Sequence, residues 1–113
     1  MKIRFLYFEG CPNSRPALER LETVIREAGI DGPIEMVEVT SPGQAVQERF
    51  LGSPSIQVNG RDIESARAED PPFFGCRVYL GDHGPSGIPP VELIRSALRE
   101  AMEPSLSPPG REA

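Results

Sequence analysis

The sequence lacks the features that place a protein in a membrane or on a polyanion. No apolar run approaches the ~20 residues needed to cross a bilayer. The first residues contain neither a long apolar segment nor a small-residue cleavage site. The net charge is −5, and the basic residues form no cluster. We therefore expect a cytoplasmic protein whose partners include neither nucleic acid nor a membrane.

Cysteine and histidine are also scarce. Two cysteines and one histidine cannot build a disulfide framework, or a four-ligand zinc site from these residue types. The glycines around residue 84 lead into Pro89 and Pro90 without a dinucleotide-binding fingerprint. We expect no cofactor, and thiol chemistry is the class of reaction that stays open.

The length of 113 residues is that of a single compact domain, and 38% of the residues are hydrophobic. We assign residues 1–103 to this domain. Residues 104–113 carry too little apolar content to fold, and we expect them to form a disordered tail.

The first half of the chain alternates strand and helix patterns. A short apolar run over residues 3–8 predicts a buried strand, and helical spacing of apolar residues predicts a helix from about residue 14 to 28. Residues 34–39 are rich in β-branched types and predict a second strand. Ser41, followed by proline and then by glutamine three residues after the serine, predicts a capped helix reaching about residue 49. This alternation indicates a parallel strand pair.

The second half predicts a hairpin and a last helix. Residues 55–58 form the third strand, and Asn59-Gly60 is a strong hairpin turn signal. The returning fourth strand has two candidates: residues 61–64 are short and polar, whereas residues 76–80 are the better strand by residue type and are favoured. Apolar residues from 91 to 101 share one helical face. The fold class is α/β, in the order β-α-β-α-β-β-α, with a mixed four-stranded sheet flanked by helices.

Cys11 lies where the first strand ends and the first helix begins. A thiol at a helix N-terminus meets unpaired N–H groups and the positive end of the helix dipole, which favour the thiolate. Cys11 is therefore a candidate nucleophile with a pKa below the ~8.5 of free cysteine. Because free cysteine is often buried and inert, a purely structural role is an equally good reading of position alone.

Two motifs favour the first of these readings. They are Gly10-Cys11-Pro12-Asn13-Ser14 and Gly52-Ser53-Pro54-Ser55-Ile56, and both resemble motifs of the thioredoxin-like superfamily. The first motif resembles the redox-active C-x-x-C loop in a C-x-x-S form. The second resembles the segment carrying a cis proline that faces the nucleophile. More narrowly, the chain resembles small bacterial thioredoxin-like proteins, some of which are described as alkylmercury lyases. The resemblance implies that Cys11 is the catalytic thiol and that Pro54, after a cis peptide bond, shapes the partner groove.

Ser14 stands where a dithiol protein has its second cysteine. A hydroxyl can stabilise a neighbouring thiolate but cannot resolve a mixed disulfide. We therefore expect monothiol chemistry, in which Cys11 forms a mixed disulfide with a small thiol or a protein. One alternative is binding of a soft metal or an organomercurial by thiolates. Another is a redox-inert module that pairs with a partner peptide beside Pro54, where the missing N–H leaves the edge open.

Cys76 is the second thiol. It can take part only if the fold brings it near Cys11, and a buried structural position inside a strand is slightly favoured. If residues 76–80 are the fourth strand, Cys76 lies at the far edge of the sheet. That placement is beyond the ~7 Å between Cα atoms that a disulfide tolerates. Oxidation with glutathione is then expected to leave one glutathione on Cys11.

Overall fold

The computed structural model describes residues 1–81 and 84–102. The expected tail, 104–113, lies outside the described residues. The elements in chain order are β1 (Ile3–Tyr7), α1 (Ser14–Glu27), β2 (Ile34–Glu38), α2 (Pro42–Glu48), β3 (Ser55–Val58), β4 (Arg61–Asp62), the 3-10 turn η1 (Ser65–Arg67), β5 (Tyr79–Gly81), β6 (Gly84–Ser86) and α3 (Val91–Met102). None of the described helices is long and apolar enough to span a membrane.

The central sheet has four strands in the order β2-β1-β3-β4. Strand β1 runs parallel to β2 and antiparallel to β3, and β3 runs antiparallel to β4. A mixed four-stranded sheet with three α-helices confirms the predicted α/β class and the parallel first pair.

Local signals account for several boundaries. Ser41 caps α2, and its hydroxyl accepts a hydrogen bond from the Gln44 amide at 3.1 Å. Asn59 and Gly60 have φ angles of 53° and 82°, as a two-residue type I′ turn requires. The predicted hairpin after β3 is therefore confirmed.

The fourth strand of the sheet is Arg61–Asp62, so the preference for residues 76–80 was wrong. A two-residue turn returns the chain immediately, and turn geometry fixes the pairing regardless of strand propensity. Residues Tyr79–Gly81 pair instead with Gly84–Ser86 in a separate two-stranded sheet.

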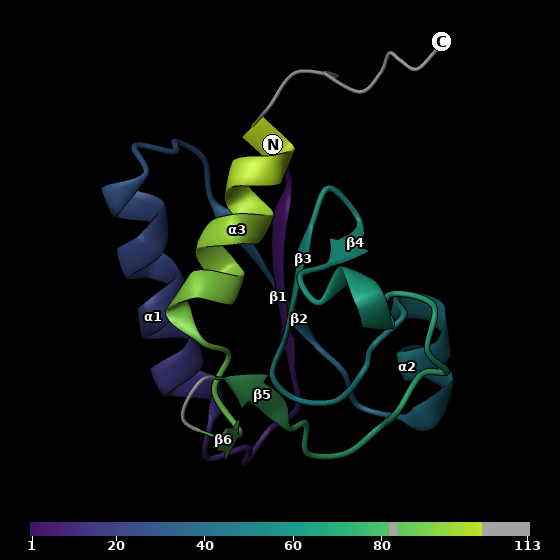
Figure 1. Ribbon diagram of the computed structural model, residues 1–113. Helices are drawn as coiled ribbons and strands as arrows, with labels where there is room; N and C mark the ends of the chain where they lie inside the picture. The colour runs from purple at the N-terminus through teal and green to yellow at the C-terminus, as the bar shows by residue number, and fades with distance from the viewer. Residues whose placement is uncertain (82–83, 103–113) are drawn as a thin grey trace, which may run out of the picture.

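Helices cover both faces of the central sheet (Figure 1). Helices α1 and α3 pack on one face over the larger apolar cluster, and α2 lies over a smaller cluster on the other. The smaller cluster contains Leu6, Val39, Ala45 and Phe50. The β5–β6 hairpin lies near the N-terminal end of α1, at the same end of the molecule as the C-terminal end of β1 (Figure 1).

Candidate functional site

Cys11 lies in the turn that joins β1 to α1. Gly10, with φ of 87°, reverses the chain, and the Cys11 amide donates to the Phe8 carbonyl at 3.3 Å. The Ser14 amide, at the first residue of α1, donates to the Cys11 carbonyl at 3.3 Å. Cys11 is only 8% exposed, so this turn holds a nearly buried thiol at the entrance to the helix.

Hydrogen bonding decides the ionisation of this thiol. Burial on its own raises the pKa of Cys11, but the Ser14 and Ser53 hydroxyls and the backbone N–H groups of Asn13 and Ser14 outweigh it. The pKa of Cys11 is therefore lowered from its ordinary value. The direction agrees with the sequence-based prediction, and the causes are specific donors near the helix start.

The Ser14 hydroxyl is positioned to stabilise a negative charge on the Cys11 sulfur. Its hydroxyl oxygen is buried and, within the described part of the chain, has no hydrogen-bond partner of ordinary geometry. It is nevertheless close enough to Cys11 to lower the pKa of the thiol. We interpret this hydroxyl as a donor that turns toward the thiolate rather than one already bonded to the neutral thiol, because a hydroxyl proton rotates freely.

The loop before β3 forms the other wall of the site. The Ser53–Pro54 peptide bond is cis, as predicted. Ser53 is fully buried, and its hydroxyl accepts a hydrogen bond from the Phe8 amide at 3.3 Å. The Pro54 carbonyl accepts a hydrogen bond from the Tyr79 hydroxyl at 2.6 Å. The fold thus brings Ser14 and Ser53 to the Cys11 thiol, with Pro54 next to Ser53.

The main chain of Ser53 is already paired within the molecule. Its amide donates to the Gly75 carbonyl at 2.8 Å, and its carbonyl accepts from the Arg77 amide at 3.0 Å. These two bonds form a parallel bridge that sets Cys76 opposite Ser53. The expectation that Pro54 leaves this edge open to a partner's backbone is therefore wrong.

Cys76 lies beside the site and not at the far edge of the sheet. It is exposed, so the preferred reading of a buried structural residue in a strand was also wrong. Both errors have one cause, because residues 73–77 do not continue the hairpin. They run alongside the loop before β3, where Phe73 also donates its amide to the Phe50 carbonyl at 2.8 Å. We call residues 73–77 the Cys76 segment.

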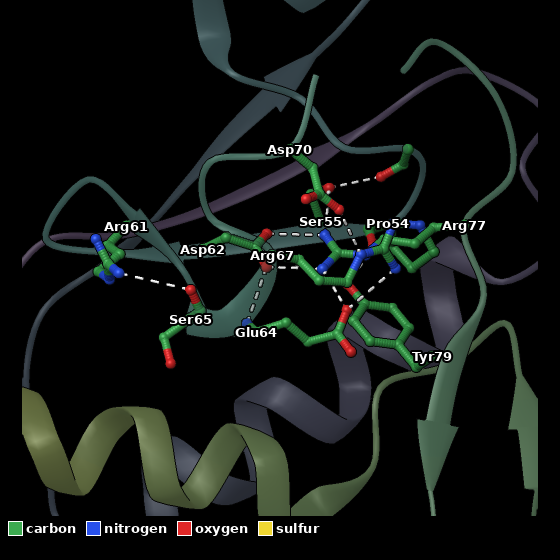
Figure 2. A network of polar contacts seen from close by, with 11 residues as sticks. Pro54, Ser55, Arg61, Asp62, Glu64, Ser65, Arg67, Asp70, Arg77 and Tyr79 are labelled. Atoms are coloured by element: carbon green, nitrogen blue, oxygen red, sulfur yellow. Dashed lines mark hydrogen bonds and ion pairs between the residues drawn. The ribbon is translucent and has the colours of Figure 1, made fainter. Parts of the chain in front are cut away.

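A buried ion-pair network fixes the Cys76 segment in place (Figure 2). Arg77 is 2% exposed and donates to both carboxylate oxygens of Asp62, at 2.8 and 2.7 Å. It also donates to Glu64 at 2.7 Å and to the Ser55 hydroxyl at 3.0 Å, while its guanidinium lies 4.3 Å from the centroid of the Tyr79 ring. Burial alone lowers the pKa of Arg77, but the hydrogen bonds and charge of Asp62 reverse this effect and raise it.

Gly52 permits the close approach of the Cys76 segment to the loop before β3, and Gly75 leaves room for the Phe73 ring. A Cβ atom on Gly52, which has φ of 106°, would lie 3.0 Å from the Arg77 Cβ and 3.1 Å from the Gly75 carbonyl oxygen. A Cβ atom on Gly75 would lie 2.6 Å from the Phe73 ring. A side chain at Gly52 would force the two segments apart, whereas a side chain at Gly75 would displace the Phe73 ring.

Arg77 and its acidic partners were not predicted from the sequence. A charged residue inside the run from Cys76 to Leu80 was the available signal, because arginine is almost never fully buried without a partner. Asp62 and Glu64 are the partners, and both follow the hairpin turn that the sequence did predict.

A shallow hollow of about 240 Å³ gives access to the thiol. Its lining includes Tyr7, Glu9, Cys11, Arg15 and Met36. Within residues 1–81 and 84–102, no group of three or more histidine, cysteine, aspartate or glutamate side chains is arranged to hold a metal ion. The hollow thus opens beside a sulfur whose pKa is lowered by its neighbours.

The comparisons with known proteins add no relative, because no family model matches the chain and no curated protein matches it. The function is therefore argued from the geometry of the site.

Proposed function

We propose that this chain is a thioredoxin-like protein that uses Cys11 as a thiol nucleophile in monothiol exchange. The observation that carries the proposal is the environment of the thiol. It is nearly buried, yet its pKa is lowered because two hydroxyls and two backbone amides stabilise the thiolate. The thiolate is the reactive form in disulfide exchange.

The neighbours of Cys11 define the class of exchange. Ser14 can donate to the thiolate but cannot form a disulfide with it, so the loop has no local resolving thiol. The Cys11 thiolate attacks a disulfide, a bond forms from its Sγ to one sulfur, and the other sulfur leaves as a thiolate that takes up a proton. The product is a mixed disulfide on Cys11.

The pairing of Ser53 narrows the class of partner. A peptide that paired its backbone at Ser53 would have to displace the Gly75 and Arg77 hydrogen bonds. This argues against a redox-inert module that captures an extended peptide beside Pro54. It favours a small disulfide such as glutathione disulfide, which can reach the sulfur through the hollow beside Tyr7 and Arg15.

A second candidate function is soft-metal or organomercurial binding by the two thiols. The observation that favours it is the bridge that places Cys76 opposite Ser53, on the edge where Cys11 lies. Thiolates are the ligands that soft metals prefer. Equimolar binding that is lost in both Cys11→Ser and Cys76→Ser would support this function, whereas thiol exchange requires only Cys11.

The monothiol proposal is tested by the pH dependence of alkylation. We would measure the rate of iodoacetamide reaction at Cys11 in the Cys76→Ser background, and expect the rate to titrate below the ~8.5 of free cysteine. Ser14→Ala and Ser53→Ala should each raise that titration point, because each removes a donor to the thiolate. A hydrogen bond to a charged group is worth about 1.5 kcal/mol or more, so the rate near neutral pH should fall about tenfold.

Ser96→Ala, a serine-to-alanine change on helix α3, is the matched control and should leave the profile unchanged. In parallel, glutathione disulfide should add one glutathione to Cys11, as read by intact mass. A Cys11 that titrates at or above the free value and takes up no glutathione would be a structural residue, and the proposed function would fall.

A further inference from the structure

We infer that Cys76 is the resolving thiol of this site, so that a mixed disulfide on Cys11 ends as an internal Cys11–Cys76 bond. This inference rests on the proposed function of Cys11. It replaces the sequence-based expectation of a lasting mixed disulfide, which depended on Cys76 lying at the far edge of the sheet.

A continuous chain of hydrogen-bonded contacts joins the two cysteines. The Cys11 amide donates to Phe8, the Phe8 amide donates to the Ser53 hydroxyl, and Ser53 forms the bridge with Cys76. Neighbouring strands lie ~4.8 Å apart, so Cys76 is one strand spacing from Ser53. The Ser53 hydroxyl also hydrogen-bonds to the Cys11 thiolate, so both cysteines are neighbours of Ser53.

The directions of the side chains put Cys76 on the correct side of this bridge. Successive residues of an extended segment project to opposite sides. Arg77 projects toward Asp62 and Ser55, as Figure 2 shows. Cys76 therefore projects to the other side from Arg77 and, as the bridge partner of Ser53, to the same side as the Ser53 hydroxyl that stabilises Cys11.

Access and anchoring also suit a resolving role. Cys76 is exposed, whereas Cys11 is nearly buried. An exposed Cys76 thiol is accessible for attack on the Cys11 sulfur of a mixed disulfide. The Arg77 network and the Ser53 hydrogen bonds anchor one end of the Cys76 segment, and edge-to-face contact of Phe74 with Phe8 at 5.7 Å anchors the other. The thiol between them is held at high local concentration.

The chemistry balances with a disulfide as the oxidant. Cys11 first attacks glutathione disulfide, forming the Cys11–glutathione bond and releasing one glutathione. The Cys76 thiolate then attacks the Cys11 sulfur, forming the Cys11–Cys76 bond and releasing the second glutathione. Both cysteines are oxidised, and one glutathione disulfide is reduced to two molecules of glutathione.

The test follows the mass of the protein after mixing the reduced full chain with glutathione disulfide and quenching with acid. Wild type should end about 2 Da lighter than its reduced form, because two thiols lose their hydrogens on forming an internal disulfide. Digestion should then yield a cross-linked peptide that contains both cysteines. Cys76→Ser should instead accumulate one glutathione on Cys11, and Cys11→Ser should form no internal bond.

Two results would overturn the inference. Wild type that keeps glutathione on Cys11 as long as Cys76→Ser does would show that Cys76 does not resolve it, and the monothiol function would stand. Covalent dimers in place of the internal bond would show that Cys76 reaches a second molecule. Failure of the proposed function is a different result, since neither wild type nor Cys76→Ser would then carry glutathione on Cys11.

A glycine pair tests whether the position of the segment matters. Gly52→Ala should slow the second step relative to the first at least severalfold, because its Cβ would lie 3.0 Å from the Arg77 Cβ and 3.1 Å from the Gly75 carbonyl oxygen and would displace the segment. Gly43→Ala is the control, since its Cβ would approach only the Ser41 hydroxyl, at 3.9 Å. Equal resolution rates in the two folded variants would count against the inference.

Discussion

At the residue scale, three short polar side chains decide the chemistry of the site. Cys11, Ser14 and Ser53 come from two segments that are distant in the sequence, and the cis peptide bond after Ser53 lies where those segments meet. The lowered pKa of Cys11 results from donors placed around the sulfur, which overcome the penalty of burial. Such a balance couples the ionisation of the thiol to the stability of the fold.

We expect the contribution of Cys11 to stability to grow with pH. The folded pKa is below the unfolded value, so the folded state favours the thiolate. This stabilisation is complete above the unfolded pKa of ~8.5 and is lost as the pH falls through the folded pKa. In the Cys76→Ser background under reducing conditions, urea unfolding should show Cys11→Ser becoming relatively less stable from neutral pH to about pH 9, by at most ~1.4 kcal/mol per pH unit.

Two outcomes of this stability comparison would contradict the expected pH dependence. A stability difference that stays flat over this range would mean that folding does not favour the thiolate. A difference that shrinks as the pH rises would mean that burial outweighs the hydrogen bonds, and Cys11 would then be a poor nucleophile.

The sequence could predict Cys11 and Ser14 because both lie in one short loop at a strand–helix junction. It could not predict that the Ser53 hydroxyl hydrogen-bonds to the same sulfur from the opposite wall, or that Cys76 lies opposite Ser53 in a parallel bridge. Those relations depend on the course of residues 63–78, which carry no strong periodic pattern and are positioned by tertiary contacts.

At the element scale, the Cys76 segment shows how a buried charge can override strand propensity. Residues 76–80 have the composition of a central strand, but Val78 and Leu80 are 53% and 74% exposed. Arg77 is drawn instead to Asp62, on the short strand β4, and this pairing fixes the segment against the loop before β3. Arg77, the residue that interrupts the apolar pattern, is thus the one that determines the path of the chain.

Arg77→Ala should therefore be among the most damaging single changes. It leaves Asp62 buried without its partner, and breaking a buried ion pair typically costs about 3–5 kcal/mol. Arg95→Ala is the control, because its ion pairs with Glu27 and Glu92 lie on exposed side chains of two helices and are worth ~1 kcal/mol or less. The free energies of unfolding in urea provide the comparison, and equal losses would contradict a structural role for the buried network.

At the scale of the whole molecule, the two faces of the sheet carry different apolar clusters and different parts of the site. Helices α1 and α3 cover the larger apolar cluster, and α1 presents Ser14 to the thiol. The other face carries α2 and the smaller cluster, in which Phe50 also contacts Phe74 of the Cys76 segment.

The α/β order and the two layers of helices could be predicted from the sequence, because the periodic patterns of the helices and longer strands extend over many residues. The short pairings of β4 with β3 and of β5 with β6 could not be assigned securely, because two or three residues carry no distinctive pattern.

This division between the two faces of the sheet predicts that the large core can be weakened without changing the site. Leu98 is 1% exposed in the cluster beneath α3, so Leu98→Ala should lower the free energy of unfolding by about 2–5 kcal/mol. Met102, one turn further along the same helix, is 52% exposed, and Met102→Ala should change stability by less than ~0.5 kcal/mol. Under conditions where both variants are folded, the pH profile of Cys11 alkylation should match that of the parent, because Cys11 is held by β1, the start of α1 and the loop before β3. A shifted profile in Leu98→Ala would show instead that the packing of α3 reaches the thiol through α1.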